Sequence, residues 1–127
     1  MKDIPNAFDW FVKLKLLRFI PWHIKDNLEH FSSFNVQFKK EYPEKEVATF
    51  ANRQDMDTFA GFEIVEGKIT ERIITFHLTF GSYNSNRNII EAEYEDFFEF
   101  MEKDVLPTMK EWIQDDDVED YIISPSD

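Results

Sequence analysis

The residues best suited to chemistry form a short polar block between two apolar runs. Arg53, Gln54, Asp55 and Asp57 lie within five positions, and apolar residues typical of β-strands precede and follow them. An arginine can bond a carboxylate at two points, and aspartates cap backbone amides in turns. The block is therefore either a pinned turn, in which Arg53 pairs with a neighbouring acid, or a polar cluster at the rim of a sheet that a partner could contact.

Asp55 and Asp57 also allow an enzymatic interpretation, because two carboxylates can act as acid and base or hold a divalent cation. The chain has no Asp-x-Asp-x-Asp-Gly calcium loop, nucleophile elbow, phosphate-binding glycine-rich loop or His-Glu-x-x-His pair. His23, His30 and His77 are never three or four positions apart, so no helical histidine pair could bind a metal. We expect no catalysis, cofactor or metal, and keep a small enzyme using the two aspartates as an alternative.

The net charge of the chain arises after residue 90. Residues 1–90 carry 12 acidic and 12 basic side chains, whereas residues 91–127 carry 14 acidic ones against Lys103 and Lys110, for a net charge of −12. Such a field repels nucleic acid and anionic membranes and attracts basic partners at enhanced rates. The alternative is a solvated helix face with a solubilising tail. If the acids bind a partner, the candidate contacts are Arg53, Asp55, Asp57, Glu91, Glu93, Glu95, Asp96, Asp115, Asp116 and Asp117.

Composition indicates one compact α+β domain spanning residues 1–127. Of its 127 residues 43% are hydrophobic and 14 are phenylalanine, which is enough for a core dominated by large rings. There is no cysteine, no apolar signal segment at the start and no apolar run near the ~20 residues that cross a bilayer. We expect a soluble cytoplasmic protein without a membrane partner.

Hydrophobic periodicity predicts N-terminal helical segments, a mainly antiparallel sheet of four to six strands and a long C-terminal helix. The residues 21–24 are expected to form a buried connector, and the conformation of residues 33–42 and 81–93 is left open. Pro107 should kink or restart the last helix, since it lacks a backbone donor. The predicted elements are helices at 7–19, 26–32 and 94–113, strands at 46–52, 58–65 and 69–80, and an acidic tail at 114–127.

The predicted C-terminal helix carries an aromatic stripe, and we expect its rings to be buried against the sheet. Helical spacing places Phe97, Phe98, Met101 and Trp112 on or near this stripe. Aromatic stacking on nucleic acid would need neighbouring cations, and the chain is acidic where these rings concentrate. The stripe is therefore interpreted as core.

The polar block and the order of the elements together resemble the SUKH superfamily, small intracellular domains that include bacterial toxin-immunity proteins and fungal cell-wall-assembly regulators. The resemblance runs from about Pro21 to Ile113: an apolar strand enters the Arg-Gln-Asp-x-Asp turn, a Phe-rich strand, a hairpin and a long strand with His77 follow, and an aromatic-rich helix closes the pattern. The chain departs from it at Leu78, in the loop after Phe80 and at Pro107.

The resemblance implies a non-enzymatic binding protein, specifically a bacterial immunity protein that neutralises a cognate toxin by direct binding. Many nuclease toxins are basic because they bind phosphate backbones, and an acidic inhibitor would mimic that substrate's charge. The alternative within binding proteins is a regulatory scaffold with an unrelated partner. The sequence leaves the toxin's identity and the oligomeric state open.

Overall fold

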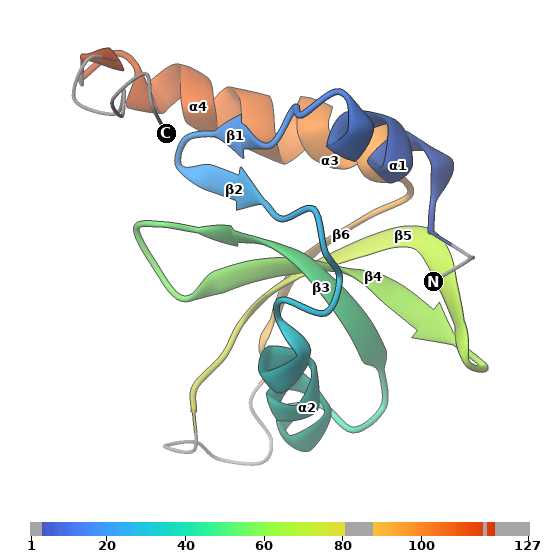
Figure 1. The fold of residues 1–127 in the computed structure, drawn as a ribbon. Coiled ribbons are helices and arrows are strands. Elements are labelled where there is room, and N and C mark those ends of the chain that lie inside the picture. Colours follow the sequence, from blue (N-terminus) through green and yellow to red (C-terminus); the bar gives the residue numbers. More distant parts are fainter. Residues whose placement is uncertain (1–3, 81–87, 116, 119–127) are drawn as a thin grey trace.

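The structure, a computed structural model, describes residues 4–80, 88–115 and 117–118. It is built on one six-stranded sheet with helices on both faces (Figure 1). The strands are β1 (Arg18–Phe19), β2 (Trp22–Ile24), β3 (Glu46–Arg53), β4 (Thr58–Val65), β5 (Lys68–His77) and β6 (Ile90–Tyr94). The helical elements are α1 (Asn6–Lys13), α2 (Ser32–Glu41), α3 (Phe97–Phe100), the π-helical turn η1 (Met101–Val105) and α4 (Leu106–Trp112).

The sheet is an antiparallel meander in which every strand pairs with its neighbours in the sequence. This confirms the predicted α+β fold with a mainly antiparallel sheet. Strand β4 was predicted at both of its ends, whereas β6 occupies part of the 81–93 segment that the sequence left open. Short turns join β3 to β4 and β4 to β5, as expected for a meander.

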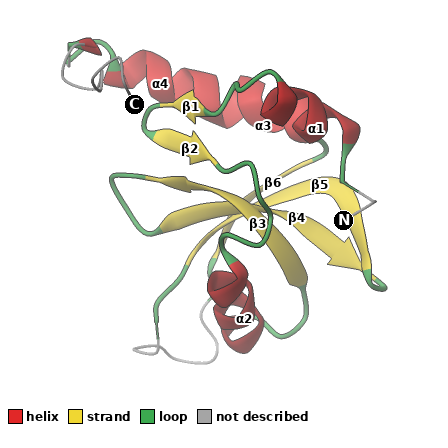
Figure 2. Ribbon diagram, viewed as in Figure 1, coloured by secondary structure: helices red, strands yellow, loops and turns green. Residues whose placement is uncertain are grey.

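The two faces of the sheet carry separate apolar clusters because successive side chains of a strand point in opposite directions. In β5, Ile73 packs with Phe50, Phe62 and the rings of α1 and α3, whereas Ile74 packs with Phe38 of α2 and other residues of the opposite face. Figure 2 accordingly shows α1, α3 and α4 on one side of the sheet and α2 on the other.

Helix α1 ends at Lys13, not at residue 19 as predicted. Leu16 N–H bonds to the Phe11 carbonyl at 2.8 Å, Lys15 N–H bonds to the Val12 carbonyl at 3.0 Å, and Lys15 has a φ of 62°. These are the bonds of a Schellman motif, which glycine usually closes. Because this position is a lysine, the sequence does not indicate that the helix ends there. Arg18 and Phe19, which were predicted to be helical, form β1.

The segment between β2 and β3 also differs from expectation. Residues 22–24 form strand β2, not only a connector, and residues 26–31 of the predicted 26–32 helix are not helical. Asn27 Oδ1 accepts a hydrogen bond from Glu29 N–H at 2.8 Å, an Asx turn that competes with helix formation. The helix begins at Ser32 and covers most of the open 33–42 segment.

The C-terminal helical segment, α3–η1–α4, begins at Phe97 because Asp96 caps it and Tyr94 belongs to β6. The π-helical turn comes directly before α4, whose second residue is Pro107. Since proline has no N–H and crowds the preceding turn, a locally wider helix accommodates it. The predicted irregularity at Pro107 is thus present.

Candidate functional site

The turn between β3 and β4 is held against β2 by hydrogen bonds. Gln54 N–H bonds to the Pro21 carbonyl at 2.9 Å, and the Gln54 side-chain oxygen bonds to His23 Nε2. Arg53 is also the register partner of Trp22, whose side chain is buried. The turn therefore projects from the end of the sheet in a fixed position.

Arg53 and Asp55 form a two-point ion pair within this turn. Arg53 Nε lies 3.0 Å from Asp55 Oδ1, and Arg53 Nη2 lies 2.7 Å from Asp55 Oδ2. Their side chains are only 20% and 22% exposed. The pinned-turn interpretation thus describes Arg53 and Asp55 well. It leaves Met56 and Asp57 exposed at the tip of the turn.

The pair should show measurable coupling in a double-mutant cycle of Arg53→Gln and Asp55→Asn. We expect a coupling free energy of about 1 kcal/mol, the upper end for exposed ion pairs, because the geometry is bidentate and partly buried. Urea unfolding of the four proteins measures it. Additive effects of the two substitutions would contradict the pair's role in holding the turn.

Arg53 lines two surface hollows at this end of the molecule. The first, here called the turn hollow, measures about 430 Å³ and is lined by turn residues 52–57 together with Phe31, Phe34 and Phe59. The second, here called the helix hollow, measures about 350 Å³ and is lined by Arg53, Thr108, Glu111, Trp112 and Asp115. The structure thus brings the predicted Asp115 beside the predicted turn, although 62 positions separate Arg53 from it in the chain.

The rims of these hollows carry an excess of negative charge. Asp57, Glu111 and Asp115 are exposed, and within the described part of the chain no side chain forms an ion pair with any of the three. The charge of Arg53 is already matched by Asp55. We call Asp57, Glu111 and Asp115 the end-surface acids; they form a local surface suited to attracting a cation.

The floor of the turn hollow is aromatic. Phe34 lies with its ring centroid 4.7 Å from that of Phe59, and Phe31 contacts both rings. Met56, 47% exposed, stands at the rim. Apolar floor and acidic rim together suit a long cationic side chain, whose methylenes can be buried while its charge meets a carboxylate.

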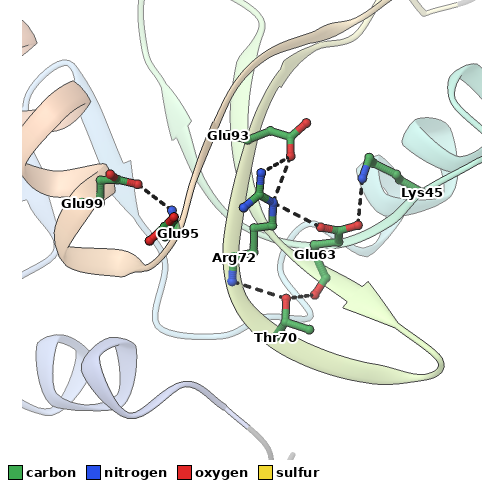
Figure 3. Close-up of polar contacts among 7 residues, drawn as sticks. All are labelled: Lys45, Glu63, Thr70, Arg72, Glu93, Glu95 and Glu99. Atoms are coloured by element: carbon green, nitrogen blue, oxygen red, sulfur yellow. Dashed lines mark hydrogen bonds and ion pairs between the residues drawn. The ribbon is translucent and has the colours of Figure 1, made fainter.

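The predicted residues of β6 form a different surface, which lines neither hollow. Figure 3 shows Glu93 accepting two bonds from Arg72, at 3.0 and 2.8 Å. Arg72 also lies 3.7 Å from Glu63, which pairs with Lys45 at 3.0 Å. The hydrogen bond from Arg72 to Glu93 raises the pKa of Arg72. Glu93 is thus part of an ion-pair ladder across the sheet, while Glu91 and Glu95 remain exposed.

Asp96 acts at the start of α3. Its Oδ1 accepts a hydrogen bond from Glu99 N–H at 2.8 Å, and Glu99 Oε1 accepts one from Glu95 N–H at 2.6 Å (Figure 3 shows the second). The Glu95 N–H bond, aided by Lys103, lowers the pKa of Glu99. This arrangement resembles a capping box, except that Glu99 accepts from the N–H of Glu95, the residue before the N-cap Asp96. The sequence pattern Asp-x-x-Glu could have revealed the cap. Asp117 is exposed, and Asp116 lies outside the described residues.

Asp104, which sequence reasoning missed, positions the helix hollow. It accepts hydrogen bonds from Trp22 Nε1 at 3.2 Å, Tyr94 Oη at 3.1 Å and Thr108 Oγ1 at 3.4 Å. Burial, with Asp104 beside it, raises the pKa of Tyr94. One carboxylate thereby joins β2, β6 and α4, and this contact fixes the wall of the hollow that carries Glu111.

Among residues 4–80, 88–115 and 117–118, no three histidine or acidic side chains gather closely enough to hold a metal ion. No helix in that same part of the chain has the length and apolar character needed to cross a bilayer. His77 lies exposed at the end of β5.

Comparison of the chain with protein-family models, curated proteins and solved structures finds no match. The chemistry of the two hollows and their acidic rims is therefore the basis on which a function can be proposed, together with the sequence resemblance.

Proposed function

We propose that this protein binds a basic protein and neutralises it, as a bacterial immunity protein neutralises its cognate toxin. The observation that carries the proposal is the position of three carboxylates, Asp57, Glu111 and Asp115, around two neighbouring hollows at one end of the fold. None of the three forms an ion pair with another residue of the described ranges. The SUKH-like sequence pattern supports the same role. The proposal places the protein in the cytoplasm, in keeping with its lack of cysteine.

The arrangement of the aspartates favours binding over catalysis as their use. Asp55 forms an ion pair with Arg53, whereas Asp57 lies at the exposed tip of the turn. The two carboxylates therefore lie in different environments and do not form a catalytic pair. A cation from the partner can reach Asp57 over the aromatic floor of the turn hollow. Glu111 and Asp115 offer a second contact nearby, and two cationic side chains could be held at once.

Long-range charge should set the speed of association. The net charge of −12 attracts a basic partner before contact, and added salt screens that attraction. Local carboxylates at the contact should matter more than distant ones of equal charge. Substitutions that remove charge without changing shape separate these two contributions.

The experiment compares three tagged proteins in capture from cells of the source organism, at low and high salt, with mass-spectrometric identification. The first is the unchanged chain, and the second carries Asp57→Asn, Glu111→Gln and Asp115→Asn. The third carries Glu29→Gln, Glu44→Gln and Glu71→Gln, an equal change of charge at exposed acids that line neither hollow. Association rates of the captured partner are then measured with each protein.

We expect one basic protein to be captured by the unchanged chain at low salt and less of it at high salt. The end-surface variant should associate about tenfold more slowly, whereas the control variant should stay within about twofold, because steering depends most on charges at the contact. Equal rates for both variants would remove the end surface from the proposal. Failure to capture any basic protein would contradict the proposed function itself.

A further inference from the structure

The C-terminal helical segment has a second apolar face that points away from the sheet. Phe98, Leu106 and Ile113 are 61%, 49% and 60% exposed. Their neighbours on the inner face, among them Phe97, Phe100 and Val105, are almost fully buried. A surface helix usually has one apolar stripe, so this segment offers a second one that no described residue covers.

The π-helical turn brings the three exposed residues into line. Leu106 and Ile113 are seven positions apart, which is close to two α-helical turns. Phe98 and Leu106 are eight positions apart, and the wider turn over Met101–Val105 absorbs the extra residue. We call Phe98, Leu106 and Ile113 the outer seam. Spacing of this kind is typical of helices that pack along another helix.

Charged residues along the outer seam are arranged in a self-complementary order. Glu102 lies between Phe98 and Leu106, and Lys110 lies between Leu106 and Ile113; both are exposed. The first half of the segment is thus acidic at the seam and the second half is basic. If two such segments run antiparallel, each glutamate meets the lysine of the other copy, whereas parallel segments would place like charges together.

We propose that the outer seam packs antiparallel against the same seam of a second copy of this chain. The two-fold axis passes near Leu106, which meets Leu106 of the second copy. Phe98 then lies against Ile113 of the second copy, and Glu102 lies beside Lys110 of the second copy. Every contact occurs twice, as an isologous dimer requires.

A neighbouring apolar surface on α1 extends the contact at the Phe98 end. The Phe11 ring is 5.9 Å from that of Phe98, which places α1 beside the seam. Trp10 of α1 and Leu14, the residue directly after this helix, are 60% and 59% exposed. Together they enlarge the apolar area beyond that of a single helix, although the net charge of −12 opposes association of two copies. The dimer should therefore be weak, in the micromolar range.

Salt should distinguish this dimer from the proposed basic partner. Added salt screens the repulsion between two acidic copies but leaves apolar burial in place, so it should strengthen or preserve the dimer. Capture of a basic partner should weaken under the same conditions. The dimer does not rest on the proposed function, and either can fail without the other.

Sedimentation equilibrium over low-micromolar to near-millimolar protein concentrations tests the proposal. Leu106→Glu puts two like charges at the two-fold axis and should weaken dimerisation by at least about tenfold. Val65→Glu is the matched control, because Val65 is 47% exposed at the far end of β4, and it should leave the dimer unchanged. Thermal unfolding of both variants establishes that they fold.

A charge exchange provides a second test that does not alter the apolar seam. Glu102→Lys and Lys110→Glu should each weaken the dimer by about threefold to tenfold, because each disrupts two symmetric pairs. The double variant should restore it. A chain that stays monomeric at every concentration, or a dimer that Leu106→Glu does not affect, would overturn the proposal. Failure of the double variant to restore the dimer would overturn the antiparallel register.

Discussion

Phe97→Ala should lower the free energy of unfolding by about 4 kcal/mol, within the range for buried aromatic truncations. Phe97 is 1% exposed and is the ring on which the layers of the larger core meet. Its ring centroid lies 4.8 Å from that of Phe11 on α1, 5.6 Å from Phe50 on β3 and 6.4 Å from Phe62 on β4. Removing the ring leaves a cavity, and α1, β3 and β4 are too tightly packed to move together and fill it. Urea or thermal unfolding measures the loss.

The adjacent residue supplies the control. Phe98→Ala should change the free energy of unfolding by less than about 0.5 kcal/mol, since the side chain is 61% exposed. The measurement is made at protein concentrations too low for the proposed dimer. Equal losses for the two variants would show that the C-terminal helical segment does not bury the face described above.

Glu41→Gln should cost about 2 kcal/mol of stability, because a buried carboxylate with four hydrogen bonds is replaced by a group that cannot accept all of them. Glu41 is 6% exposed at the end of α2. Its Oε1 accepts from Thr79 N–H at 2.9 Å and Thr79 Oγ1 at 2.8 Å. Its Oε2 accepts from Phe80 N–H at 3.0 Å and Gln37 Nε2 at 2.6 Å. Because glutamine keeps only one acceptor oxygen, the N–H of either Thr79 or Phe80 would lose its side-chain acceptor.

The effect of Glu41 should depend on pH. Burial raises its pKa, but the hydrogen bonds from Gln37, Thr79 and Phe80 outweigh burial and bring the pKa below its ordinary value of 4.5. A carboxyl whose pKa is lower in the folded state contributes stability above the unfolded-state pKa and loses it as pH falls through the folded-state pKa. The difference in stability between the unchanged chain and Glu41→Gln should therefore be constant near neutral pH and shrink as pH falls below 4.5.

An exposed glutamate three positions further along the chain provides the comparison. Glu44→Gln, in the turn after α2, should change stability little and show no comparable loss at low pH. If the difference between the unchanged chain and Glu41→Gln grew on acidification, the assigned direction of the pKa shift would be wrong.

The parts of the fold that could be predicted were those specified by local patterns. The bounds of strand β4 can be predicted because Asp57 and the Glu66–Gly67 turn flank a mainly apolar run, which only Glu63 interrupts after Thr58. The end of α1 cannot be predicted from the sequence because Lys15 adopts a left-handed backbone conformation. A sequence indicates that conformation only where the residue is a glycine. The prediction that Phe98 is buried is wrong, since its side chain is 61% exposed. That prediction rests on regular helical spacing, whereas a π-helical turn interrupts the helix.

In the candidate site, too, local contacts could be predicted from the sequence and long-range contacts could not. The Arg53–Asp55 pair joins residues two positions apart, so residue types alone indicated it. The helix hollow depends on how α4 packs beside the turn, and Asp104 fixes that packing through residues as distant as Trp22. Glu41 likewise reaches Thr79 across 38 positions. Contacts of this range leave no periodic signal in a single sequence.

The most direct measurement of the central claim, that the protein neutralises a basic partner, is growth of cells that produce the captured protein. We expect the captured protein to arrest growth when it is produced alone. Co-production of the unchanged chain described here should restore growth. The variant with Asp57→Asn, Glu111→Gln and Asp115→Asn should restore it less than the control variant with Glu29→Gln, Glu44→Gln and Glu71→Gln. Harmless production of the partner, or an arrest that co-production leaves unrelieved, would contradict the account.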